Sequence, residues 1–409
     1  MPTARQADAP TTTPEASPDP RVRAPFPVGA ATVLLDAFRP GDRFLATPTR
    51  TLLAHGVLAD VPHGPEPVAE RVMTTLRRAR SENRAAPLVV GAIPFDQSAP
   101  AALVVPETTR GGPALAADPL VALPVERPAA PSAWTVRPEP EPEVYGKSVA
   151  SAVDRMWKGE FSKVVLARTL EVTGTGELDI AGMLQRLART DPTGYTFALP
   201  TAPGRTLLGA SPELLVSRHG DRLVSNPLAG SIPRSDDLAE DVRRAAALLE
   251  SAKDLHEHAV VVDAVHQALA PYCTSIDVPA RPSLIRTAAM WHLSTTITGT
   301  LASPNVSALE VACALHPTPA VCGTPTDAAR RVIRESEPFD RGFYTGMVGW
   351  GDTEGNGEWV VTLRCAEAER RALRLYAGAG VVAASEPEAE TAETAAKFRT
   401  FLNAVGAGE

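Results

Sequence analysis

Apolar runs of strand length recur along this chain without a regular alternation with helical segments. Clusters of β-branched and aliphatic residues predict strands at 31–37, 87–94, 101–105, 163–173, 194–199, 205–218, 356–366 and 372–383. The last two runs predict a hairpin that turns across Glu367–Arg371. Helical periodicity predicts helices at 146–159, 236–270, 324–334 and 385–404. Because strands and helices do not alternate one by one, the pattern disfavours a doubly wound parallel sheet and favours a large antiparallel α+β fold.

The composition suits a globular protein that does not bind nucleic acid. The 409 residues are 44% hydrophobic and carry a formal net charge of −8, so a sizeable core is possible but a basic surface is not expected. Four separated cysteines, Cys273, Cys313, Cys322 and Cys365, favour reduced thiols over a disulfide framework or a zinc site. No apolar run approaches the roughly 20 residues of a membrane span, and no signal peptide is expected. We therefore expect a cytoplasmic protein.

Two proline-rich segments suggest how the chain is organised. Residues 1–27 lack periodicity and are rich in Pro, Ala and Thr, which predicts a disordered tail. Residues 123–145 predict an extended connector over the surface. No internal repeat is visible, and we expect a single domain over residues 28–409.

Two predicted helices each carry carboxylates three residues apart, which places each pair on one helical face. The pairs are Asp254 with Glu257 and Glu390 with Glu393. Together they could form a site for Mg²⁺, which takes one or two protein carboxylates with water and substrate oxygens. Each pair could equally form a solvated acidic face, which is the commoner role of such pairs. Zinc is disfavoured although two histidines stand near the first pair, because no H-E-x-x-H spacing exists.

The helix that carries the second pair has a recognisable N-terminus. Ser385 is expected as its N-cap, with Glu388 in the capping-box position and Pro387 in the first turn. The glycines of 378–380 lie just ahead of this helix. They would let backbone N–H groups approach an anion, or they would only relieve crowding between a strand and the helix.

Three charged residues interrupt apolar runs that we expect to form strands. Arg364 lies within VVTLRCA, so its guanidinium should meet a carboxylate, either from a ligand or in a structural ion pair. Lys163 opens KVVLA, and Glu213 lies between two apolar runs in GASPELL. A buried lysine has a lowered pKa and can act as a base, whereas a buried glutamate has a raised pKa and can act as an acid. Both residues could instead be strand-end charges that point to solvent.

Taken together, these segments resemble the chorismate-utilising enzyme family, which includes isochorismate, salicylate, anthranilate and aminodeoxychorismate synthases. The resemblance covers about residues 145–405, and its pieces follow the family's order. They are FSKVVLAR (161–168), GASPELL (209–215), NPLAGS (226–231), KDLHEH (253–258), WHLSTTITG (291–299), HPTPAVCGTP (316–325), EPFDRGFYTGMVGW (337–350), VTLRCAEAE (361–369), and YAGAGVV with PEAETAETAAK (376–397).

The resemblance implies large antiparallel, sandwich-like sheets flanked by helices, with the site in a deep cleft. It implies that Glu257 and Glu393 bind Mg²⁺ directly, that Asp254 and Glu390 surround the ion, and that the ion holds the ring carboxylate of chorismate. Arg364 and Tyr344 would hold the enolpyruvyl carboxylate. The remaining pocket residues that it implies are Gly378, His292, Gly230, Ser231, Ala320, Val321 and Lys397.

Within the family, the chain is most similar to the siderophore-type isochorismate synthases. That similarity implies a Mg²⁺-dependent isomerase in which water adds at ring carbon 2 while the hydroxyl leaves carbon 4. Lys163 would be the general base that activates the water. Glu213 would be the general acid that protonates the departing hydroxyl. No protein partner is implied beyond the small-molecule substrate.

Lys163 is the main discriminator among the family's activities. Ammonia-using, anthranilate-type members typically carry glutamine there, and many aminodeoxychorismate synthases carry a lysine where this chain has Ala229. Salicylate synthases share Lys163 and eliminate pyruvate from isochorismate, so that activity remains an alternative, as does an amino-transferring one. A non-catalytic scaffold is disfavoured because the residues assigned to chemistry and metal are all present. Departures from the family pattern at Leu255 and Thr391 concern packing only.

Overall fold

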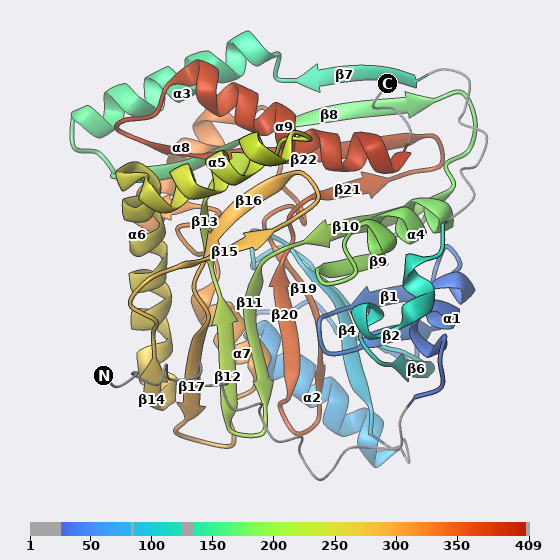
Figure 1. Cartoon of the computed structure of the whole chain (residues 1–409). Helices are drawn as coiled ribbons and strands as arrows, with labels where there is room; N and C mark the ends of the chain where they lie inside the picture. Colours follow the sequence, from blue (N-terminus) through green and yellow to red (C-terminus); the bar gives the residue numbers. More distant parts are fainter. Residues whose placement is uncertain (1–25, 83–85, 125–133, 406–409) are drawn as a thin grey trace, which may run out of the picture.

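The computed structural model describes residues 26–82, 86–124 and 134–405, which form two large β-sheets and a small third one (Figure 1). The strands pair antiparallel throughout the three sheets. Helices cover the outer faces of the large sheets. The predicted class, antiparallel sheets flanked by helices, is therefore confirmed. None of the helices in the described ranges is long and apolar enough to cross a membrane.

The first sheet has ten strands. They are β1 (Arg43–Ala46), β2 (Thr51–His55), β6 (Thr108–Gly112), β7 (Trp134–Glu139), β8 (Lys163–Gly174), β9 (Tyr195–Ala202), β10 (Arg205–Ser211), β18 (Gly323–Thr324), β21 (Cys365–Ala368) and β22 (Ala372–Val382). Their order is β18-β8-β22-β21-β10-β9-β1-β2-β6, and β7 also pairs with β8. The predicted hairpin is confirmed, since β21 pairs with β22.

The second sheet has nine strands, and the small sheet has three. The nine are β3 (Ala59–Asp60), β4 (Leu88–Ile93), β5 (Ala102–Val105), β11 (Leu214–His219), β12 (Arg222–Asn226), β14 (Cys273–Asp277), β17 (Ile297–Leu301), β19 (Met347–Asp352) and β20 (Gly357–Val361). Their order is β14-β17-β12-β11-β20-β19-β4-β5-β3. The small sheet has the order β13-β16-β15, formed by β13 (Leu228–Pro233), β15 (Ser283–Arg286) and β16 (Met290–Ser294).

The helices lie outside the sheets and between their edges (Figure 1). The α-helices are α1 (Ala30–Ala37), α2 (Val68–Ser81), α3 (Pro142–Trp157), α4 (Ile180–Thr190), α5 (Leu238–Glu250), α6 (Ala252–Leu269), α7 (Ala308–Leu315), α8 (Thr326–Ser336) and α9 (Pro387–Val405). Short 3₁₀ turns are η1 (Leu115–Ala117), η2 (Pro119–Ala122) and η3 (Ala270–Tyr272).

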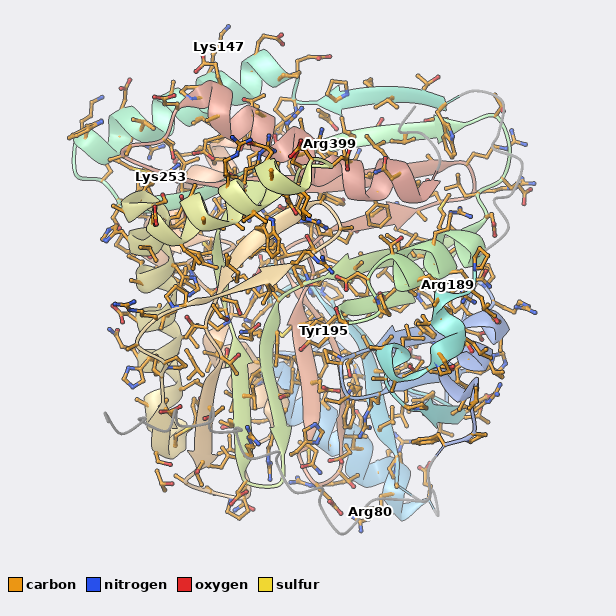
Figure 2. The ribbon with its side chains drawn as sticks, in the orientation of Figure 1. Arg80, Lys147, Arg189, Tyr195, Lys253 and Arg399 are labelled. Atoms are coloured by element: carbon orange, nitrogen blue, oxygen red, sulfur yellow. The ribbon has the colours of Figure 1, made fainter. Side chains whose placement is uncertain are left out.

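The large sheets pack face to face, because their strands are apolar on both faces. Along β4, Val90 and Ala92 join a core cluster with residues of both sheets, whereas Val89 and Ile93 pack with α2, α6 and α7. On the other outer face, residues of α1, α4 and α9 pack against the ten-stranded sheet. Side chains fill the space between these layers (Figure 2). The result is a β-sandwich with helices on both outer faces.

Several predicted elements were wrong in type or extent. The run 31–37 forms helix α1, since a short apolar run fits a buried helix as well as a strand. The run 236–270 is two helices, because Ser251 accepts a hydrogen bond from the Asp254 N–H and so caps a new helix, α6. Runs 205–218 and 356–366 each form two strands that belong to different large sheets.

The predictions for the proline-rich segments are only partly testable. Residues 1–25 and 125–133 lie outside the described residues, so the predicted tail and domain limits stay predictions. Within 134–145, the connector was wrong, since β7 pairs with β8 and α3 begins at Pro142. Helix α9 begins at Pro387 as expected, but Ser385 precedes it and its hydroxyl accepts a hydrogen bond from the Val382 N–H. All four cysteines are free thiols.

Candidate active site

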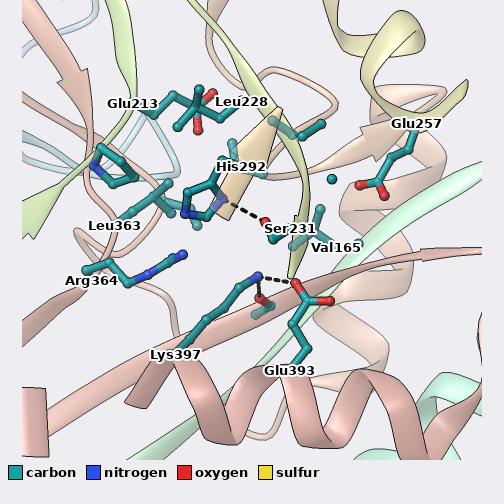
Figure 3. A pocket seen from close by; sticks show the side chains of 18 of the residues that line it. Val165, Glu213, Leu228, Ser231, Glu257, His292, Leu363, Arg364, Glu393 and Lys397 are labelled. Atoms are coloured by element: carbon teal, nitrogen blue, oxygen red, sulfur yellow. Dashed lines mark hydrogen bonds and ion pairs between the residues drawn. The ribbon is translucent and has the colours of Figure 1, made fainter. Parts of the chain in front are cut away.

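A cavity lies where both large sheets meet the small sheet and helices α6 and α9 (Figure 3). It encloses about 740 Å³ of space including its open mouth. The lining residues are Val165, Pro212, Glu213, Leu228, Ala229, Gly230, Ser231, Lys253, Asp254, Glu257, His292, Ala320, Val321, Tyr344, Thr345, Leu363, Arg364, Gly378, Gly380, Glu390, Glu393 and Lys397.

The predicted site residues come together at this cavity. Fourteen of the fifteen line it, although they come from eight or more separate segments of the chain. The fifteenth, Lys163, is buried beside it and forms an ion pair with the lining residue Glu257. Glu213 and Arg364 lie on one side of the cavity, and Glu257 and Glu393 lie on the other (Figure 3).

The Glu213 side of the cavity is built where a pair of strands passes from one large sheet to the other. Strands β10 and β21 pair in the first sheet, and their continuations β11 and β20 pair in the second. Two backbone hydrogen bonds join the paired chains at this crossing. The Val361 N–H donates to the Glu213 carbonyl, 3.1 Å, and the Ala210 N–H donates to the Arg364 carbonyl, 3.1 Å. Both charged residues therefore sit at the break between sheets, where their side chains are not paired across a ladder.

Glu213 has the environment of a carboxylic acid and not of a carboxylate. Its side chain is 2% exposed. Burial raises its pKa to about 8, although a backbone hydrogen bond from Leu228 and the charges of Lys163 and Arg364 act in the opposite direction. The group is therefore protonated at neutral pH and can donate a proton into the cavity. The predicted raised pKa of this residue is confirmed.

Arg364 presents an unpaired positive charge to the cavity. Its backbone is left-handed, with φ of 45°, which turns the side chain out of the strand direction. Within the described ranges its guanidinium forms no ion pair or hydrogen bond, so a structural ion pair does not explain it. Tyr344 also lines the cavity and stacks on Tyr376 with 5.0 Å between ring centroids. This end of the cavity is suited to a carboxylate ligand.

His292 contributes a neutral imidazole. The ring is 3% exposed, and Nδ1 lies 2.8 Å from the Ser231 hydroxyl (Figure 3). Burial holds its pKa well below the usual value, and the charges of Arg364 and Lys397 act in the same direction. The Nε2 atom is buried without a hydrogen-bond partner among the described residues, so it is available to a polar atom of a bound molecule.

The opposite end of the cavity collects four carboxylates, and three of them are paired with lysines. Lys163 Nζ lies 2.8 Å from Glu257 Oε1, and Lys397 Nζ lies 2.5 Å from Glu393 Oε1. Lys397 also donates a hydrogen bond to the Gly378 carbonyl, 2.8 Å. The third pair joins Lys253 Nζ to Glu390 Oε1, 3.3 Å. The two carboxylate pairs therefore face the cavity. They do not form the solvated acidic helix faces that the sequence left as an alternative.

The lysines keep one of these carboxylates ionised in spite of its burial. Burial raises the pKa of Glu257, but the ammonium groups of Lys163, Lys253 and Lys397 outweigh it and hold the pKa below its usual value. For Glu390, burial and the charge of Glu393 prevail, and its pKa is raised. This end of the cavity therefore offers the ionised carboxylate of Glu257 as an oxygen ligand. It also offers the carboxyl of Glu390, whose ionisation a nearby cation would favour.

Three glycines allow side chains of the site to approach the cavity wall. A Cβ on Gly380 would lie 2.5 Å from Glu257 Oε1. Gly230 has φ of 78°, and a Cβ there would lie 3.0 Å from the Asp254 Cβ. A Cβ on Gly378 would lie 2.8 Å from the Tyr344 hydroxyl oxygen. Gly378 and Gly380, which were predicted to relieve crowding or admit an anion, therefore make room for side chains of the site, and so does Gly230.

The donor set fits a hard divalent cation such as Mg²⁺. It consists of carboxylate oxygens, and Mg²⁺ needs only one or two of these with water and substrate oxygens. No three acidic, imidazole or thiolate side chains in the described part of the chain converge as a ready-made ligand cluster, because three of the carboxylates face lysines instead. His258 is engaged with the Ala229 carbonyl and the Thr295 hydroxyl, so it is a structural residue.

Sequence reasoning missed several residues that line the cavity. The most prominent is Lys253, which lies four residues before Glu257 and so shares its helical face. That spacing could have revealed it. Thr345 was also missed, and its unusual positive φ of 55° is not indicated by any local pattern. The other missed residues are Val165, Pro212, Leu228 and Leu363.

Comparisons with known proteins agree with this geometry. The family model described as "Chorismate binding enzyme" matches residues 120–406. Isochorismate synthase DhbC of Bacillus subtilis is 54% identical over 384 residues, covering 91% of this chain and 96% of its own length. The vibriobactin-specific isochorismate synthase of Vibrio cholerae is 42% identical over 369 residues, covering 89% of this chain and 91% of its own.

A solved structure gives the same result. It is a Bacillus anthracis protein assigned as the 2,3-dihydroxybenzoate-specific isochorismate synthase DhbC, with 50% sequence identity and a TM-score of 0.86. The match covers 92% of this chain and 99% of that protein. The family resemblance read from the sequence motifs is thereby confirmed, and the chain belongs to the chorismate-binding enzyme family.

Proposed function

We propose that this chain is an isochorismate synthase, an isomerase that converts chorismate to isochorismate. The relatives that cover almost the whole chain carry this activity in their names. The observation that carries the proposal is the buried carboxyl of Glu213, protonated at neutral pH, across a cavity from an end that contains a buried lysine. A water-dependent isomerisation needs an acid and a base on opposite parts of one ring.

The proposed reaction is balanced by two proton transfers. Lys163 removes a proton from a water molecule as its oxygen bonds to ring carbon 2. The ring double bonds shift, the bond between carbon 4 and its hydroxyl breaks, and Glu213 donates its proton so that the hydroxyl leaves as water. One water is consumed and one is released, so the product is an isomer. Each proton transfer is expected to contribute on the order of 10²–10⁴ in rate.

Lys163 and Glu213 differ in whether they are ready to transfer a proton at the start of the cycle. Glu213 is already protonated at neutral pH, since burial raises its pKa to about 8. Lys163 forms an ion pair with Glu257 at 2.8 Å, so its ammonium group must first give a proton to solvent before the neutral amine can accept one from the attacking water. After each turnover both groups exchange protons with solvent to restore their starting states.

We propose Mg²⁺ as the cofactor at the acidic end. Glu257 and Glu393 would be its direct ligands, with Asp254 and Glu390 around them. When bound, the ion would supply positive charge that fixes the ring carboxylate of chorismate and stabilises charge that develops on the ring. The oxygen-only donor set and the glycines that admit Glu257 and Asp254 support this assignment.

Residues at the other end would orient the enolpyruvyl group. Arg364 has a guanidinium free to bind a carboxylate, and the Tyr344 hydroxyl lies beside Gly378 in the same cavity. The His292 Nε2 atom would hydrogen-bond a polar atom of the substrate. Backbone and small side chains complete the pocket at Gly230, Ser231, Ala320, Val321 and Gly378, and the Lys397 ammonium lies against Glu393.

The cellular setting forms part of the proposal. The names of the relatives point to vibriobactin and to 2,3-dihydroxybenzoate, so we propose that the isochorismate made here enters a siderophore pathway. Four free cysteines fit the reducing cytoplasm. Every residue named for the cavity belongs to this chain, so chorismate is the only partner that the proposal requires.

Product analysis tests this function directly. Purified protein is incubated with chorismate and millimolar Mg²⁺, with and without EDTA, and products are separated by chromatography. Isochorismate that forms only in the absence of EDTA is the expected result. Salicylate with pyruvate would identify a salicylate synthase, and an amino adduct that requires ammonium would identify an anthranilate-type enzyme. Unchanged chorismate under all conditions would reject a catalytic role.

A further inference from the structure

Lys253 stands apart from the other two lysines at the acidic end of the cavity. Its side chain is 40% exposed, whereas those of Lys163 and Lys397 are 3% and 11% exposed. Its contact with Glu390 is the longest of the three ion pairs, at 3.3 Å. Lys397 has a second acceptor in a backbone carbonyl, but Lys253 has no other hydrogen-bond acceptor among the described residues. Lys253 can therefore leave its carboxylate at small cost and move into solvent.

The positive charge of Lys253 acts on the whole acidic end and not on Glu390 alone. Its ammonium group contacts Glu390, and Asp254 and Glu257 follow it on the same helix. It also lies on the same face of α6 as Glu257, four residues away, and it lines the cavity.

A divalent cation and Lys253 would compete for the same oxygens. Glu390 is 2% exposed, so its carboxylate has little room to bind both a lysine ammonium and a metal ion on separate sides. The Lys253 ammonium and a divalent cation in this space would also repel each other even if they bound different carboxylates. Three of the four carboxylates turn toward lysines instead of toward one another, as such competition requires.

We propose that Lys253 is an exchangeable counter-ion of Glu390 that a divalent cation must displace, and that it thereby weakens the affinity of the site for the metal alone. This inference rests on the proposed function, because it takes the acidic end as the metal site. Lys253 is a positioning residue in this proposal. It holds the Glu390 carboxylate oriented until the cation replaces it.

Direct metal binding tests the proposal without reference to turnover. Isothermal titration calorimetry with MgCl₂ and no chorismate is carried out on the full chain and on Lys253→Met, Lys253→Arg and Lys147→Met. Lys147 is an exposed lysine of α3 that does not line the cavity, so its replacement removes the same charge outside the cavity (Figure 2). Lys253→Arg keeps the charge in place. Far-UV circular dichroism checks that each variant is folded, which is expected because an ion pair with a partly exposed lysine contributes little stability.

Lys253→Met is expected to bind Mg²⁺ about tenfold more tightly than the unchanged protein, from the loss of one positive charge near a divalent ion in a largely hydrated site. Lys253→Arg and Lys147→Met should stay within about threefold of the unchanged protein, since the local charge is kept in both. Equal or weaker binding by Lys253→Met would overturn the inference while leaving the metal site intact. If none of the four proteins bound Mg²⁺, the proposed metal site itself would be wrong, and the inference would fall with it.

Discussion

Replacing Glu213 with glutamine should separate its catalytic role from its effect on stability. Glutamine has the same shape as a protonated glutamate but cannot release a proton. If Glu213 protonates the departing hydroxyl, the variant should lose on the order of 10²–10⁴ in kcat. Chorismate binding should change little, because the neutral amide matches the neutral carboxyl that the cavity already holds. The measurement is chorismate turnover at saturating substrate, with chorismate binding followed by calorimetry.

The same residue predicts how the stability of the protein depends on pH. Its pKa is about 8 in the folded state against an ordinary value of 4.5, so the folded state binds the proton more tightly. The stability that this provides is fully present below pH 4.5, decreases as the pH rises and is lost once the pH passes about 8. At 1.36 kcal/mol for each pH unit, the change from 4.5 to about 8 corresponds to about 5 kcal/mol.

Glu213→Gln removes this dependence, because glutamine does not titrate. Urea unfolding at several pH values between 5 and 9 should show the variant gaining stability relative to the unchanged protein as the pH rises. Glu354→Gln, the same exchange at an exposed position, is the matched control and should follow the unchanged protein. Two results would refute the reasoning: parallel pH profiles for Glu213→Gln and the unchanged protein, or turnover by the variant above one tenth of the normal rate. Turnover by the unchanged protein should also fall above pH 8, as Glu213 loses its proton.

Three further substitutions test other parts of the site. Lys163→Ala should lower kcat by on the order of 10²–10⁴ while Mg²⁺-linked chorismate binding, measured by calorimetry, is largely kept; near-normal turnover would remove Lys163 from the mechanism. Arg364→Met should lower kcat/KM about 10- to 100-fold, mainly through KM, because a charge-assisted hydrogen bond to the substrate is lost; an unchanged KM would contradict that contact. Gly380→Ala places a Cβ 2.5 Å from Glu257 Oε1, so calorimetry should show weaker Mg²⁺ binding by a folded protein, and unaltered binding would argue against Glu257 as a ligand.

Local patterns were sufficient to identify much of the site. The carboxylates of α6 and of α9 are three residues apart, and this spacing places two side chains on the same face of any α-helix. Once the motifs indicated the family, fourteen of fifteen predicted residues proved to line one cavity. The ion pairs among them were not predictable in the same way. Lys163 and Glu257 are 94 residues apart, and only the tertiary fold brings their atoms to 2.8 Å.

The fold was predictable in class but not in its connections between sheets. Strand β4 is buried on both faces, so its sequence, LVVGAI, is continuously apolar. A continuous apolar run has no period of two, and it gives no sign of the residue at which a chain leaves one sheet for another. The runs 205–218 and 356–366 each read as one strand, although Pro212 and Glu213 interrupt the first and Arg364 interrupts the second. A left-handed residue such as Arg364 is equally invisible in a pattern of apolar side chains.

These unpredicted crossings are what give the site its chemistry. A glutamate at the end of an ordinary strand would reach solvent, and its pKa would stay near 4.5, so it could not serve as an acid at neutral pH. Glu213 is instead held between two packed sheets, because the crossing strands continue on either side of it and exclude water. The same crossing releases Arg364 from its ladder and turns its charge into the cavity. Motifs therefore identify which residues act. How deeply these residues are buried, and hence their pKa, depends on where paired strands pass from one sheet to the other.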